Sequence, residues 1–159
     1  MNISLITVGK VKERYLRDAI EEYAKRLSRY CRLEIIEVPD EKIPENASEK
    51  EEQIIKEKEG DLILKYIKDN MFVITMEIQG KQPSSEELAA QIKDLGVRGE
   101  SNLAFVIGGS LGLAKSVQQR SDYKMSFSRM TFPHQLFRVM LLEQIYRAFR
   151  IINGEPYHK

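Results

Sequence analysis

Glycines and hydroxyl side chains follow two short strand-like segments in the second half of the sequence. The apolar run 103–107 is followed by the glycine-rich segment 108–112, and the segment 123–127 is followed by the loop 128–132. Glycine permits positive φ angles and lets a ligand approach the backbone closely. Strands that end in such loops form a ligand crevice at the carboxyl edge of an open α/β sheet. We therefore expect a ligand site between these two loops.

A long helix is predicted directly after the second loop, from Pro133 to Ile152. Proline suits the first helical turn, where its missing N–H has no partner, and it keeps the preceding residue extended. Apolar side chains cover more than half of this helix, whereas Glu143, Arg147 and Arg150 gather on the remaining face. Such a wide apolar surface needs a second layer to cover it. We predict that a second copy of the chain supplies that layer, so that the protein is a homodimer.

The remaining segments alternate between strand and helix patterns. Strands are predicted at 3–8, 33–38, 72–77, 102–107 and 123–127, and helices at 14–30, 48–67, 84–95, 114–120 and 133–152. Ser48 with Glu51, and Ser84 with Glu87, match the capping box that begins a helix. Strict alternation predicts an α/β fold, a parallel sheet with helices on both faces. No linker or repeat divides the chain, so we expect one domain over 1–159.

Composition restricts the class of protein. The chain has 159 residues, 42% hydrophobic and 31% charged, which is ordinary for a globular domain. Cys31 is the single cysteine, so an intrachain disulfide is impossible and a reducing compartment is favoured. No segment has the length or apolarity of a signal peptide or a membrane span. We expect a cytoplasmic protein without a membrane partner.

The net charge of +1 conceals an uneven distribution. Residues 10–32 contain eight basic and four acidic side chains (+4), residues 37–61 four basic and ten acidic (−6), and residues 113–159 eight basic and three acidic (+5). Two basic regions around an acidic one could present a basic face to RNA. Solvated helix faces of mixed charge would produce the same counts. Charge alone leaves both interpretations open.

Several common functional sites are disfavoured, because the sequence lacks the required residues at the required spacing. His134 and His158 have no cysteine or histidine companion at ligand spacing, so no metal site is expected. The chain contains no phosphate-binding loop of the Gly-x-x-x-x-Gly-Lys type, and the segment 108–112 does not match the dinucleotide fingerprint. Ser110 is not in a nucleophile elbow, so a hydrolase triad has no support. A ligand-binding α/β domain of unassigned chemistry remains.

Longer motifs carry a family resemblance. They are Val-Ile-Gly-Gly-Ser-Leu-Gly-Leu (106–113), Ser-Phe-Ser-Arg-Met-Thr-Phe-Pro-His-Gln (126–135), Glu-Gln-Ile-Tyr-Arg-Ala (143–148) and Pro-Tyr-His-Lys (156–159), together with Arg138 and the segments 8–10 and 77–81. Together they resemble the RlmH family of SPOUT methyltransferases, once called the YbeA family. The likeness extends over the whole chain, and the motifs are long enough to make chance agreement improbable.

The resemblance implies a fold and an activity that residue spacing alone does not indicate. SPOUT enzymes thread the C-terminal part of the chain through a loop to form a trefoil knot, a topology that is nearly absent among folds. The family binds S-adenosyl-L-methionine in the knot and acts as a homodimer. Its product is N3-methylated pseudouridine in bacterial 23S ribosomal RNA of the large subunit. The implied cofactor residues are Met76, Gly108 and the loop Phe127, Ser128, Arg129, Met130, Thr131 and Phe132.

The resemblance and the chemistry of the C-terminal tail suggest further roles. Tyr157 and His158 suit a stacked base and a proton relay, so they are the candidate catalytic residues. The candidate RNA contacts are Arg129, Arg138 and Lys159. Arg147 could also position a phosphate, or it could pair with the glutamate four residues earlier. The residue that removes the N3 proton is not identified by these patterns.

Simpler interpretations accompany each assignment. The glycines could form only a tight turn, Ser128 and Thr131 could be turn residues, and a tail so close to the terminus would ordinarily fray. Another SPOUT reaction, such as 2′-O-methylation of ribose in transfer RNA, is the alternative activity. A ribosome-binding module that has lost catalysis is the alternative from a different class, although the intact glycine segment and the intact loop argue against it.

Overall fold

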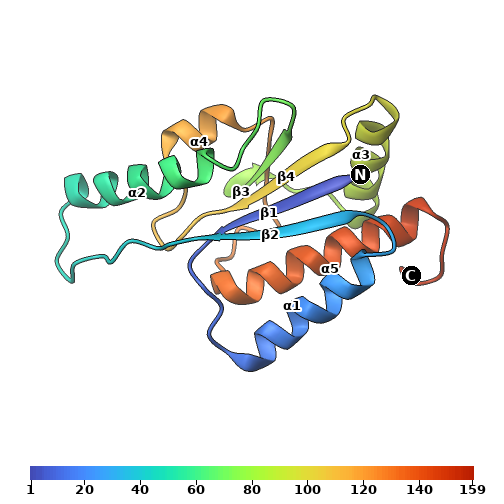
Figure 1. Cartoon of the computed structure of the whole chain (residues 1–159), viewed down its shortest axis with the longest axis horizontal. Coiled ribbons are helices and arrows are strands. Elements are labelled where there is room, and N and C mark those ends of the chain that lie inside the picture. Colours follow the sequence, from blue (N-terminus) through green and yellow to red (C-terminus); the bar gives the residue numbers. More distant parts are fainter.

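The computed structural model describes all residues, 1–159, and has five strands that alternate with five helices (Figure 1). In chain order the elements are β1 (Asn2–Val8), α1 (Arg14–Leu27), β2 (Arg32–Val38), α2 (Glu49–Leu64), β3 (Phe72–Lys81), α3 (Ser85–Val97), β4 (Asn102–Ile107), α4 (Lys115–Arg120), β5 (Tyr123–Met125) and α5 (His134–Ile152). Every predicted strand and helix is present.

The five strands form one parallel sheet in the order β2-β1-β4-β3-β5. Apart from their first residues, the neighbouring strands β1 and β4 are buried throughout. After Asn102, β4 is a continuous apolar run, and after Asn2, β1 is apolar except for the small buried side chains of Ser4 and Thr7. These sequences suit the position, because strands covered on both faces have no polar side to alternate with. The predicted parallel sheet is confirmed.

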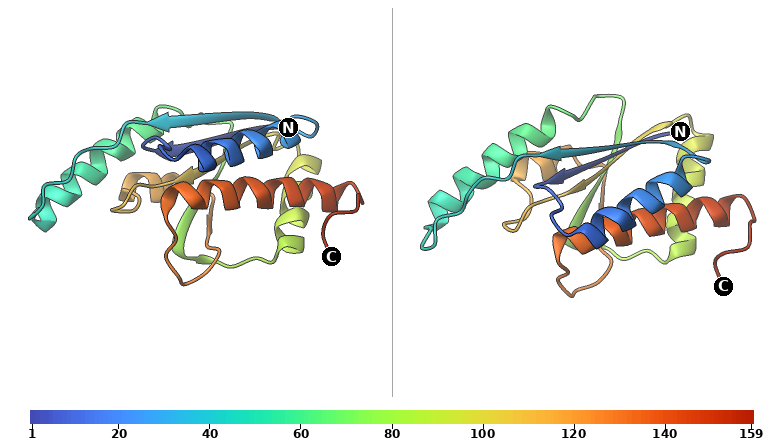
Figure 2. Two further views of the ribbon diagram at one scale, coloured as in Figure 1. Left: turned by 90° about the horizontal axis from the view of Figure 1, so that it is seen from below. Right: turned by 60° about the horizontal axis from the view of Figure 1, so that its bottom comes forward.

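Helices cover both faces of the sheet (Figures 1 and 2). On one face α1, α3 and α5 pack against side chains such as Leu5 and Phe105, which form the larger core. On the opposite face α2 and α4 contribute Ile63 and Val117 to a smaller core with Val106. Successive strand residues point to opposite faces, so β4 supplies both cores from adjacent positions. The predicted α/β architecture with helices on both faces is confirmed.

Helix α5 lies beside both α1 and α3 and packs against the sheet. Seven of its residues are buried within the single chain. The wide apolar surface is therefore covered in large part without a second copy, which weakens that argument for dimerisation. Leu136 remains 40% exposed, and Val139 and Met140 are half-buried. The homodimer stays a prediction, with a smaller uncovered surface than the sequence suggested.

Two strands differ from the prediction by more than one residue. β3 continues beyond residue 77 to Lys81, because both Met76 and Lys81 pair with Met125 across an irregularity in the register. Gly80 makes this close approach possible, since a Cβ atom there would lie 2.7 Å from the carbonyl carbon of Lys124. β5 ends at Met125 rather than at Phe127, and the chain then turns into the β5–α5 loop. Pairing between β3 and β5 decides both strand boundaries, and local sequence patterns contain no information about that pairing.

Helix starts follow the predicted signals with two differences. Ser84 and Glu87 form a complete capping box. Ser48 accepts a hydrogen bond from the Glu51 N–H, but the Glu51 carboxylate accepts from the Ser48 hydroxyl rather than from the backbone. Pro133 is the N-cap of α5 with ψ of 131°, one position before the predicted first turn.

The C-terminal third is consistent with a knotted fold: β5 lies at the edge of the sheet, and α5 returns across one face of it. The threading itself stays a prediction. No helix is both long and apolar enough to cross a membrane.

Candidate functional site

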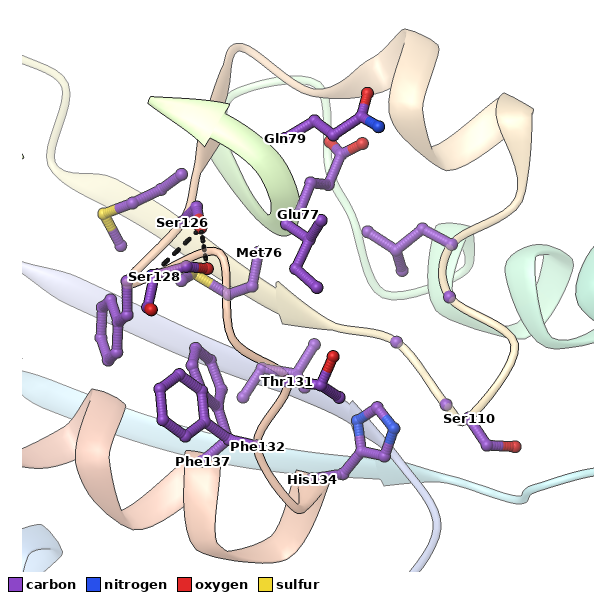
Figure 3. A pocket seen from close by; sticks show the side chains of 18 of the residues that line it. Met76, Glu77, Gln79, Ser110, Ser126, Ser128, Thr131, Phe132, His134 and Phe137 are labelled. Carbon is purple, nitrogen blue, oxygen red and sulfur yellow. Dashed lines mark hydrogen bonds between the residues drawn. The ribbon is translucent and has the colours of Figure 1, made fainter. Parts of the chain in front are cut away.

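A pocket of about 580 Å³ lies at the carboxyl ends of β3, β4 and β5 (Figure 3). Its walls come from the end of β3 (76–79), the β4–α4 loop (108–113), the β5–α5 loop and the first turn of α5. This is the crevice that the sequence predicted. The predicted residues Met76, Gly108, Phe127, Ser128, Met130, Thr131 and Phe132 all line it. Arg129 is exposed and is not among the lining residues.

The β4–α4 loop presents backbone to the pocket. The Gly112 N–H donates to the Gly109 carbonyl at 3.0 Å, and Gly112 has a φ of +85°, which favours glycine. A Cβ atom on Gly108 would lie 3.0 Å from the Gly112 carbonyl carbon and oxygen. The glycines therefore do form a tight turn, and that turn is itself part of the pocket wall.

Serine side chains shape the β5–α5 loop. The Ser126 hydroxyl accepts from the Ser128 N–H at 3.2 Å and donates to the Ser128 carbonyl at 2.9 Å, as Figure 3 shows. The Ser128 hydroxyl in turn accepts from the Met130 N–H at 3.1 Å. These short-range bonds hold the loop in one conformation. Phe127 of this loop packs against Phe137 of α5 with ring centroids 4.8 Å apart, and both rings line the pocket.

An acidic side chain that the sequence analysis did not assign stands on the β3 wall. The Glu77 carboxylate accepts from the Thr75 hydroxyl at 2.6 Å and from the Gln118 amide at 2.8 Å, and no cationic side chain pairs with it. Both Glu77 and Gln118 line the pocket. A fixed negative charge beside an apolar cavity suits a ligand that carries positive charge. The one available signal was a glutamate that directly follows the apolar residues of a predicted strand.

His134 also lines the pocket and was not assigned a role. Desolvation at the pocket wall, and then the positive charge of Arg138, lower the pKa of His134 below its ordinary value. The imidazole therefore stays neutral over a wider pH range than a solvated histidine. It can accept or donate a hydrogen bond toward a ligand.

Arg138 has a different position from the one expected of an RNA contact. It is buried, and its guanidinium donates to the Glu37 carboxylate at 2.7 Å and to the carbonyls of Val8 and Gly9 at 2.9 and 2.8 Å. A buried guanidinium with these partners is not available to a phosphate, so the predicted RNA contact of Arg138 is wrong for this conformation. Its role is to join the first turns of α5 to the ends of β1 and β2.

The C-terminal tail is ordered against its own chain. The Tyr157 hydroxyl donates to Glu143 at 3.0 Å, and its ring meets Tyr146 edge-on at 4.9 Å. His158 contacts Arg147 through Nδ1 at 3.1 Å and Glu86 through Nε2 at 2.6 Å. The predicted pairing of Arg147 with Glu143 is confirmed at 2.6 Å.

Tyr157 and His158 do not reach the pocket of their own chain. Neither residue lines it, and the tail lies at the end of α5 opposite to the first turn (Figure 1). The tail cannot fold over the pocket of its own chain in this conformation, because the 19-residue helix separates them. Lys159 is exposed. No cluster of three histidine, cysteine or acidic side chains could hold a metal ion.

The sequence matches a known family of proteins. Residues 1–158 match the family described as "Predicted SPOUT methyltransferase". Two relatives named "Ribosomal RNA large subunit methyltransferase H", from Clostridium beijerinckii and Clostridium tetani, are 71% and 70% identical over 159 residues, the full length of both chains in each case. A probable methylase family protein from Haemophilus influenzae has a similar fold, with a TM-score of 0.51, 15% identity and alignment over 99% of this chain and 70% of that one. The chain therefore belongs to the SPOUT methyltransferase family.

Proposed function

We propose that the protein transfers a methyl group from S-adenosyl-L-methionine to N3 of a pseudouridine in 23S ribosomal RNA of the large subunit. The observation that carries this proposal is the pocket between the glycine turn and the β5–α5 loop, in a chain of the SPOUT methyltransferase family. The names of its full-length relatives support ribosomal RNA of the large subunit as the substrate.

The residues of the pocket fit the proposed methyl donor. A volume of about 580 Å³ is within the range of small-molecule sites. Met76, Phe127 and Phe137 supply apolar surface for a planar adenine, and the bare backbone at Gly108 supplies polar groups beside it. Glu77 supplies a negative charge for the positively charged ligand. When bound, S-adenosyl-L-methionine supplies an electrophilic methyl group on a cationic sulfur.

The chain's contribution to catalysis is then chiefly orientation. Holding two reactants in productive geometry removes a large part of a barrier without a covalent intermediate. The N3–H of the base must also lose its proton. The pKa of Tyr157 is raised to about 12 by desolvation and by its bond to Glu143, so its hydroxyl stays protonated at neutral pH. We assign to Tyr157 a stacking or donor role, and to His158 the proton transfer.

This assignment requires a second subunit. Because the tail lies far from its own pocket, Tyr157 and His158 can act only if they reach the pocket of a partner. The uncovered part of α5, where Leu136, Val139 and Met140 retain exposed surface, is the proposed homodimer interface. Arg129 and Lys159, both exposed, remain the proposed RNA contacts near the site.

Mass spectrometry of ribosomal RNA from cells that lack the protein tests the reaction. The expected result is loss of one methyl group on a large-subunit pseudouridine, restored by the wild-type gene. Loss of a ribose methyl group in transfer RNA would show the alternative SPOUT reaction instead. Unchanged methylation of all RNA would mean that the protein is not a methyltransferase in these cells, which would favour the ribosome-binding module without catalysis.

Calorimetry on the isolated protein tests the cofactor separately. Wild type should bind S-adenosyl-L-methionine or its demethylated product. Gly108→Val should abolish binding, because its Cβ alone would press on the Gly112 backbone at 3.0 Å and distort the turn. Gly99→Val is the control, since an added Cβ there has no neighbour within 4 Å, although its φ of +86° adds local strain. No binding by wild type at millimolar ligand would refute the proposal.

A further inference from the structure

We propose that the segment 10–17, between β1 and the second turn of α1, is a docking surface for the phosphate backbone of the ribosomal RNA. The inference rests on the proposed function, because it assigns to that substrate a surface outside the pocket. The segment reads Lys-Val-Lys-Glu-Arg-Tyr-Leu-Arg.

The segment carries a concentration of unpaired positive charge. Its cations Lys10, Lys12, Arg14 and Arg17 are all exposed, and none takes part in an ion pair. Glu13 is the one acidic residue in the segment, so four cations and one anion leave a net charge of +3. Unpaired cations on ordered backbone can neutralise phosphates with little rearrangement.

Buried neighbours hold these cations in place. Val11 and Leu16 are 8% and 6% exposed, so the segment is anchored at two points. Tyr15, by contrast, is 70% exposed between Arg14 and Leu16. A bare aromatic ring among cations suits a surface where unpaired bases can stack.

The anchored segment starts directly beside the pocket. Val8 ends β1, and its Cγ1 would lie 3.3 Å from a Cβ on Gly109, a residue of the pocket wall. The carbonyls of Val8 and Gly9 accept from Arg138, one turn beyond His134 on α5. The Val11 N–H donates to Glu37, the partner of the same guanidinium. The cations are therefore fixed relative to the pocket wall.

The negative charge on the opposite side of the sheet also favours RNA binding on the α1 side. Residues 37–61, which include most of α2, have a net charge of −6, and α2 covers the face of the sheet opposite to α1. A polyanion would be repelled from the α2 side and attracted to the α1 side. The fold therefore places the acidic helix α2 and the helix α1 on opposite faces of the sheet, whereas the short helix α4, with Lys115 and Arg120, shares the face of α2.

The test compares two triple variants that lose the same charge. Lys10→Gln/Lys12→Gln/Arg14→Gln removes the proposed surface, and Lys50→Gln/Lys58→Gln/Lys65→Gln removes three exposed lysines on or just after α2. Methyl transfer to purified large subunits would be measured under single-turnover conditions at several salt concentrations. The first variant should raise the half-saturating subunit concentration about 10-fold or more, and should flatten its log–log salt dependence by about 2, which is roughly 0.7 for each lost phosphate contact.

The control variant and the affinity for the cofactor show whether a loss of activity comes from the proposed surface alone. The α2 variant should bind subunits nearly as wild type does, with at most a small loss from its lower net charge, and calorimetry should show unchanged S-adenosyl-L-methionine affinity for both variants. Equal losses in the two variants, or an unchanged salt dependence in the first, would overturn the docking surface. If wild type methylates no subunits, the proposed function fails by itself, and co-sedimentation of the same variants with subunits still decides whether the segment binds RNA.

Discussion

Replacing Arg138 with methionine should destabilise the protein by about 3 kcal/mol, because the change removes a buried junction between α5 and the ends of two strands. The guanidinium donates to Glu37 and to the carbonyls of Val8 and Gly9. An unsatisfied buried acceptor costs about 1–3 kcal/mol. Glu37 contributes less, since its side chain is 36% exposed and water can replace the lost donor.

One feature of the wild-type junction offsets part of the cost of the two carbonyls and Glu37. The Arg138 Nε atom is buried without a hydrogen-bond partner, so methionine also removes an unsatisfied group. The net loss is then about 2–4 kcal/mol. For a chain of this length, that corresponds to a fall in Tm of roughly 5–15 °C.

Urea and thermal unfolding would be measured at one fixed protein concentration, since dimerisation contributes to apparent stability. Arg98→Met is the matched control, because its ion pair with Asp94 is 59% and 63% exposed and should be worth less than about 0.5 kcal/mol. Glu37→Gln keeps an acceptor for the guanidinium, so its loss of stability should lie between those of Arg138→Met and Arg98→Met. A loss below about 0.5 kcal/mol for Arg138→Met, or equal losses for Arg138→Met and Arg98→Met, would refute the junction.

Deleting residues 157–159 should cost about 1–2 kcal/mol of stability through lost aromatic packing, while circular dichroism stays near wild type and single-turnover methyl transfer to ribosomes falls sharply; transfer at the wild-type rate would show that the tail is only structural. His158→Ala should lower turnover more than cofactor affinity, and equal losses would contradict a role at the nucleobase. Because the pKa of His134 is lowered from 6.5, the folded state resists protonation of this side chain, so stability should fall as pH drops through 6.5. This fall should be smaller in His134→Asn when the free energy of unfolding is measured at several pH values. Burial raises the pKa of Glu59, so its charge opposes folding above that pKa; Glu59→Gln should be more stable than wild type at neutral pH, with a difference that shrinks on acidification, and no gain at neutral pH would contradict this.

Much of the pocket could be predicted from sequence because its parts are local. Strand β4 is a short apolar run that ends in glycines, and the β5–α5 loop lies between a strand and a proline. Parallel strands bring their carboxyl ends to one edge, so two such loops must be near neighbours if their strands are. The residues that were missed, Glu77 and His134, are polar groups whose importance comes from facing the cavity, and side-chain direction at the end of a strand or helix is set by packing.

The sequence by itself determined the alternation of strands and helices, the helix starts and the glycine turn, because each depends on propensities and hydrogen bonds within a few residues. Only the tertiary structure decided the strand order, in which β5 pairs outside β3, and with it the length of both strands. It also placed Arg138 in the interior rather than at the surface, and the C-terminal tail far from its own pocket. The contacts of the Arg138 junction join residues a hundred or more positions apart, and the β3–β5 pairing joins residues about fifty positions apart. Local patterns carry no information about such distant partners.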